Sequence, residues 1–138
     1  MPVDGQHVQR GEYRSAQPFV VVVESDANTV AFVCSALAMA SITAVGCPCN
    51  ARAQAYIRYT RPDIVFLTCS LVDGPEWNIY TSLRADPLTE MIAFVFSTNK
   101  ADQFRTKLEV YNPHMVQFLP NPYPLDALVR MIINASCV

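Results

Sequence analysis

Short polar segments follow the apolar runs of this sequence, and their side chains could do chemistry. They are Glu24-Ser25-Asp26, Thr68-Cys69-Ser70, Ser97-Thr98-Asn99 and Pro120-Asn121-Pro122. The hydroxyl of Thr68 is neutral, so it would need a base to act as a nucleophile, and Glu24 is the nearby candidate. Asp26 is placed to cap the helix that follows it.

The cysteines offer a second possible chemistry. They lie at positions 34, 47, 49, 69 and 137, an odd number at irregular spacings, unlike a secreted disulfide scaffold. Cys47-Pro48-Cys49 suggests a metal site, but His7 and His114 are far away in sequence and no second paired-cysteine motif follows. We therefore expect buried or loop thiols in a reducing cytoplasm, and no metal.

Composition limits what the chain can be. Its 138 residues are 51% hydrophobic and 16% charged, which favours one folded domain over a disordered chain. The net charge of −2 provides no basic excess for nucleic acid. Residues 1–17 are polar and lack the apolar stretch of a signal peptide, and no run is long enough to span a membrane. We expect a flexible leader over 1–17, a domain over 18–138 and a cytoplasmic location.

Apolar strand-like runs alternate with helical stretches after the leader. Strands are predicted at 19–23, 43–45, 63–67, 92–96 and 115–119, and helices at 27–40, 50–59, 75–85, 101–111 and 124–135. Five strands that alternate with five helices predict an α/β fold with a doubly wound five-stranded parallel sheet. The carboxyl ends of such strands meet at one edge of the sheet, so any chemistry should lie there.

The chain from residue 18 to about 135 resembles the receiver domains of bacterial two-component response regulators. The resemblance implies a flavodoxin-like (βα)5 receiver fold. It places Glu24 and Ser25 at the family's acidic pair, and Thr68 at the phosphate-accepting Asp. It places Thr98 at the family's Ser or Thr, Asn121 at the Lys before a proline, and Phe118 at the switch aromatic.

Departures from the family pattern predict a degenerate pocket, that of a pseudo-receiver. The family's acceptor is an ionised carboxylate that attacks directly, whereas Thr68 is a hydroxyl. Ser25 and Thr68 remove two carboxylates from the Mg²⁺ site, and Asn121 replaces the balancing cation. We expect no cofactor, little Mg²⁺ binding and no enzymatic activity.

These observations lead to one functional hypothesis and two rivals. The first is a phosphorelay receiver that signals by protein contact without phosphorylation, with a histidine kinase, phosphotransfer protein or regulator as partner. The alternative is a working phosphoacceptor that uses a non-standard residue. A flavin-phosphate site is a third idea, but the loop at 24–27 lacks glycine and is acidic.

The first predicted helix suggests a contact surface. Residues 27–41 contain no charged side chain, and Phe32, Ala36 and Met39 form a second apolar stripe beside the one that should face the sheet. Either neighbouring segments cover this stripe, or it docks a partner or forms a homodimer. Tyr111 could add a further contact.

Overall fold

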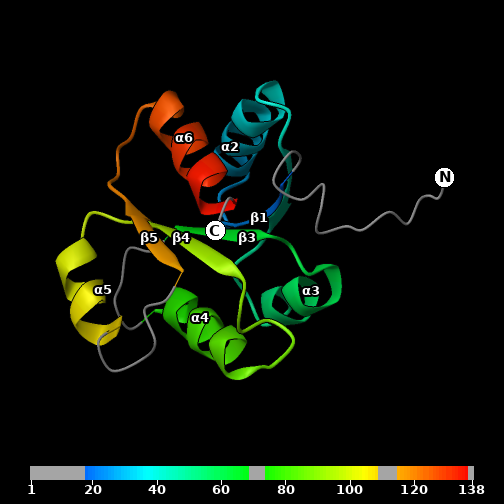
Figure 1. The fold of residues 1–138 in the computed structure, drawn as a ribbon, viewed down its shortest axis with the longest axis vertical. Helices are drawn as coiled ribbons and strands as arrows, with labels where there is room; N and C mark the ends of the chain where they lie inside the picture. Colours follow the sequence, from blue (N-terminus) through cyan, green and yellow to red (C-terminus); the bar gives the residue numbers. More distant parts are fainter. Residues whose placement is uncertain (1–17, 69–73, 109–114, 137–138) are drawn as a thin grey trace, which may run out of the picture.

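The computed structural model describes residues 18–68, 74–108 and 115–136, and its strands form one parallel sheet (Figure 1). The predicted leader over 1–17 and Tyr111 lie outside the described residues. The sheet has the order β2-β1-β3-β4-β5. Its strands are β1 (Phe19–Val23), β2 (Thr43–Cys47), β3 (Ile64–Thr68), β4 (Ala93–Ser97) and β5 (Val116–Leu119).

Helices cover both faces of this sheet. They are α2 (Ala27–Met39), α3 (Ala53–Thr60), α4 (Pro75–Ala85), α5 (Ala101–Leu108) and α6 (Leu125–Ser136). Helices α2 and α6 lie side by side on one face, and α3, α4 and α5 lie on the other (Figure 1). The predicted doubly wound α/β fold is confirmed.

Strand β1 shows how the sheet divides its side chains. Val20 and Val22 pack with α2 and α6, whereas Val21 and Val23 pack toward α3 and α4, and all four are fully buried. Successive residues of a strand point to opposite faces, so a continuous apolar run is what a sheet covered on both sides requires. Trp77 and Tyr80 of α4 are also buried, so they belong to the core.

Some element ends differ from the sequence-based expectation. Strands β3 and β4 each continue one residue further, to Thr68 and Ser97, because the parallel pairing extends past the last apolar side chain. Helix α3 begins at Ala53, later than expected, because the Asn50 side chain accepts a hydrogen bond from the Arg52 N–H (2.8 Å) in the preceding turn.

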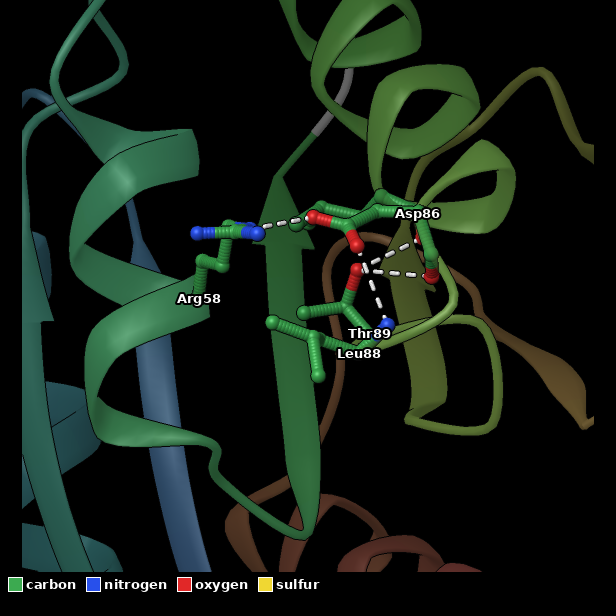
Figure 2. Close-up of polar contacts among 5 residues, drawn as sticks. Arg58, Asp86, Leu88 and Thr89 are labelled. Atoms are coloured by element: carbon green, nitrogen blue, oxygen red, sulfur yellow. Dashed lines mark hydrogen bonds and ion pairs between the residues drawn. The ribbon is translucent and has the colours of Figure 1, made fainter.

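The end of α4 is tied to α3 by polar contacts (Figure 2). The Asp86 carboxylate accepts from Arg58 Nε at 2.6 Å and from the Leu88 N–H at 3.0 Å. The buried hydroxyl of Thr89 donates to the Leu83 carbonyl at 2.7 Å, which satisfies a carbonyl in the last helical turn. These bonds end the helix and hold the chain as it turns toward β4.

No helix among the described residues is long and apolar enough to cross a bilayer.

Candidate functional site

The carboxyl ends of β1, β3 and β4 bring Glu24, Thr68 and Ser97 to one edge of the sheet. Thr68 and Ser97 are paired across β3 and β4, and the pairing of Val23 with Leu67 leads Glu24 to the same level of the sheet. The Glu24 N–H donates to the Cys47 carbonyl at 3.1 Å, which fixes the start of the loop. The Glu24 carboxylate then accepts the Asp26 N–H at 2.9 Å.

Two neighbouring hydroxyls at the end of β4 have different surroundings. Ser97 is 1% exposed, and its Oγ has no hydrogen-bond partner among the described residues. Thr98 is also buried, but its hydroxyl accepts the Lys100 N–H at 3.0 Å and its own N–H donates to the Leu119 carbonyl at 3.2 Å. The hydroxyl in register with Thr68 is therefore that of Ser97, whereas Thr98 holds its own loop.

The sequence analysis included Ser97 among the strand-end segments, but it gave the family's Ser or Thr position to Thr98. That reasoning ended the strand at Phe96 and left the next two residues in a loop. A shift of one residue moves a side chain to the opposite face of a sheet. The available signal was the strict alternation that begins inside β4, where Phe94 and Phe96 face α4 and Ala93 and Val95 face α6.

Ser25 and Asp26 are both engaged by backbone groups. Ser25 Oγ accepts the Cys49 N–H at 3.1 Å, which joins the loop after β1 to the loop after β2. Asp26 is the predicted cap of α2, since its carboxylate accepts from the Thr29 hydroxyl (2.5 Å) and N–H (3.1 Å). The bonds from Thr29 lower the pKa of Asp26, so this carboxylate stays ionised in its capping role.

Cys49 lies near the acidic groups Glu76 and Glu24, and Glu76 was not among the residues considered from the sequence. Burial, followed by the charge of Glu76 in the first turn of α4, raises the pKa of Cys49 to about 11. Burial likewise raises the pKa of Cys47. Both thiols are therefore protonated at neutral pH. Among residues 18–68, 74–108 and 115–136, no three His, Cys, Asp or Glu side chains form a group able to hold a metal ion.

The turn after β5 adds a tyrosine to the edge. Asn121 is exposed and precedes Pro122 through a cis peptide bond. The half-buried ring of Tyr123 packs edge-on against Phe66, with 6.2 Å between the ring centroids. Burial and then the charge of Glu24 raise the pKa of Tyr123.

Phe118 lies on the other side of the sheet from the Thr68–Ser97 pair. Its half-buried ring packs 5.6 Å from the ring of Phe96, between centroids, and the Arg105 guanidinium lies 4.8 Å from its centroid. A cation over an aromatic face is attractive and holds the ring in place. Phe118 is therefore packed between β4 and α5.

Comparisons with known proteins show which solved structures share this fold. No family model matches the chain, and no curated protein matches it. Solved structures do match: the signal receiver domain of a putative Luxo repressor protein from Vibrio parahaemolyticus has a TM-score of 0.74 at 14% identity and covers 88% of this chain and 91% of its own. The chain has the fold of response regulator receiver domains.

Two further structures with the receiver fold are similar. The chemotaxis response regulator CheY4 of Vibrio cholerae has a TM-score of 0.73 at 13% identity, with 86% of this chain and 98% of that chain covered. A response regulator from Desulfuromonas acetoxidans has a TM-score of 0.66 at 18% identity, with 84% and 94% covered. The similarity in fold thus extends over most of the chain.

Proposed function

We propose that this chain is a receiver-type signalling module of a two-component phosphorelay, and that it acts by protein contact without phosphorylation. A histidine kinase, phosphotransfer protein or regulator is the partner. The receiver fold supports the class of module. The observation that carries the proposed mode of action is the position of Thr68 at the end of β3. Its partner in register on β4 is the hydroxyl residue Ser97, and the loop after β1 brings the carboxylate of Glu24.

Thr68 is poorly placed to act as a nucleophile. A neutral hydroxyl must lose its proton to a base as it attacks, and an ester of phosphate would result where a carboxylate would form an acyl phosphate. Glu24 is the candidate base, but its Oε2 already accepts the Asp26 N–H at 2.9 Å. That oxygen is therefore already engaged by the backbone of its own loop.

The donor set at the edge also fits Mg²⁺ poorly. Mg²⁺ requires several hard oxygen ligands in near-octahedral geometry. Glu24 offers one carboxylate, and the Ser25 hydroxyl is occupied by the Cys49 N–H. Asn121 is neutral, so it cannot supply the cation that would balance an added phosphate.

Phosphorylation from a small donor tests this proposal. The purified chain is incubated with acetyl phosphate and Mg²⁺, and its intact mass is measured. A matched variant, S25D/T68D/N121K, rebuilds three carboxylates with Glu24 and one cation on the same scaffold. Circular dichroism checks that both proteins fold. We expect the variant to gain one phosphate in a Mg²⁺-dependent manner and the native chain to gain none.

Each other outcome has a definite meaning. A phosphate on Thr68 of the native chain would refute the phosphorylation-independent mode and favour the working phosphoacceptor. A folded variant that gains no phosphate would show that these positions are not equivalent to a receiver's pocket, which would remove the main support for the assignment.

A further inference from the structure

An apolar groove runs between α2 and α6 on the face away from the sheet. Its volume is about 500 Å³, and α2 contributes Ala36, Met39 and Ala40 to its lining. The α6 side is formed by Leu125, Asp126, Val129, Arg130 and Ile133. The small side chains of Ala36 and Ala40 leave room between the helices, and α2 carries no charged residue along its length.

Large apolar side chains project beside this groove. Met39 is 89% exposed and Phe32 is 56% exposed, and Leu125 and Ile133 of α6 are also exposed. Burial of such side chains contributes about 1.5–3 kcal/mol each, so a cluster of them on one face favours association. The same face therefore holds projecting side chains and a cavity that could receive them.

The charges at the groove have a pattern that suits a two-fold axis. Asp126 and Arg130 are its only charged lining residues, and they lie one helical turn apart on α6, joined by an exposed ion pair of 2.8 Å. If two α6 helices pack antiparallel, each Asp126 faces the Arg130 of the other copy. An isologous interface requires this kind of self-complementarity, because the same patch must bind itself.

We infer that the α2–α6 groove is a homodimer interface, with a second copy of this chain as its occupant. Met39 and Phe32 of each copy enter the groove of the other, and the Asp126 and Arg130 side chains pair across the two-fold axis. The inference does not depend on the proposed mode of signalling, because it concerns another face of the domain and is read out by mass in solution.

Sedimentation velocity over a range of protein concentrations tests the apolar contacts. The native chain should show a concentration-dependent dimer. F32E/M39E should raise the dissociation constant of this dimer by more than about tenfold. The matched control is Y59E/M91E, since Tyr59 (87% exposed) and Met91 (64% exposed) are large apolar residues outside the groove. This control should leave the dimer unchanged.

A charge exchange tests the two-fold arrangement. D126R gives a chain with two positive groups at the groove, and R130D gives a chain with two negative groups. Each variant alone should be monomeric, because like charges then face each other across the axis. When the two variants are mixed, opposite charges meet and a heterodimer should form. Circular dichroism of each variant confirms that the helices are intact.

Three results would overturn the inference. They are a native chain that stays monomeric at every concentration, a dimer that survives F32E/M39E, and charge variants that fail to associate on mixing. If the native chain is monomeric, the occupant of the groove is a different protein and not a second copy of this chain. None of these results bears on the acetyl phosphate experiment, so the two proposals can fail separately.

Discussion

Thr68 and Ser97 are paired residues of the neighbouring strands β3 and β4. In these strands Phe66 and Val95, each two residues earlier, pack with the helices α2 and α6. Because side chains alternate along a strand, both hydroxyls face that same side. The centre of the sheet edge is therefore a pair of uncharged hydroxyls.

The unpartnered hydroxyl of Ser97 can be removed without loss of stability. Burial of a polar group without a partner costs about 1–3 kcal/mol, so S97A should leave the free energy of unfolding unchanged or raise it by up to about 1 kcal/mol. Thr89 is the comparison, because its buried hydroxyl donates to the Leu83 carbonyl at 2.7 Å. T89V should lower stability by about 1–2 kcal/mol in urea unfolding. A similar loss for S97A would show that the Ser97 hydroxyl is hydrogen-bonded.

Gly46 of β2 is required because Val30 of α2 lies directly over it. A Cβ at position 46 would lie 2.3 Å from Val30 Cγ1, which is a severe overlap. G46A should therefore lower the free energy of unfolding by about 1–3 kcal/mol. The double variant G46A/V30A should lose less than the sum of the two single variants, because V30A removes the methyl group that the new Cβ would overlap. Strict additivity in urea unfolding would contradict this contact.

Arg84 of α4 bonds to the backbone just before β4, and its Nη2 also donates to the Met115 carbonyl before β5 at 3.5 Å. Its Nη1 donates to the carbonyls of Glu90 (2.7 Å) and Ile92 (2.6 Å), and its guanidinium lies 4.8 Å from the Phe94 ring centroid. R84M should lower the free energy of unfolding by about 2–4 kcal/mol, because hydrogen bonds to a charged donor are lost. R84K should recover less than half of that, since an ammonium lacks the planar fork. Full recovery by lysine would show that only the charge matters.

Asp86 should make stability depend on pH in the acid range. The Leu88 N–H, and then Arg58, lower the pKa of Asp86 from its ordinary value of 3.8. A carboxyl whose pKa is lower in the folded state stabilises the fold above its unfolded pKa, and this contribution disappears as pH falls through the folded pKa. D86N should therefore be less stable than the native chain at neutral pH, and the difference should shrink below about pH 4.

Urea unfolding across this pH range gives the measurement. Asp26 also has a lowered pKa, so D86N should retain part of the acid dependence. A stability difference that stays constant down to about pH 3 would show that the Asp86 carboxylate is not the titrating group.

Much of the fold could be predicted from local patterns. The β-branched run at 19–23 predicted a strand buried on both faces, and β1 pairs with β2 and β3 and buries its four valines completely. Asp26 and Pro75 marked the starts of α2 and α4, because a side-chain cap and a fixed φ act within a few residues. Strand ends were less certain, because pairing with a neighbour decides where a strand stops.

The candidate site was predicted only in part. Glu24, Ser25, Thr68 and Asn121 come to the expected end of the sheet. The hydrogen-bond partners of these side chains could not be predicted. Ser25, for example, accepts the N–H of Cys49, which is 24 residues away in sequence. Contacts of this range depend on how two loops approach each other, and no local pattern encodes that approach.

The amino-acid sequence by itself determined the alternating strands and helices and the uncharged residue types at the strand ends, because these follow from side-chain chemistry and short-range periodicity. Only the tertiary structure decided that Ser97 and not Thr98 is paired with Thr68, and that Met39 lines an open groove between α2 and α6. The physical reason is that strand register and helix–helix spacing are set by packing between distant segments, where a shift of one residue reverses the face that a side chain occupies.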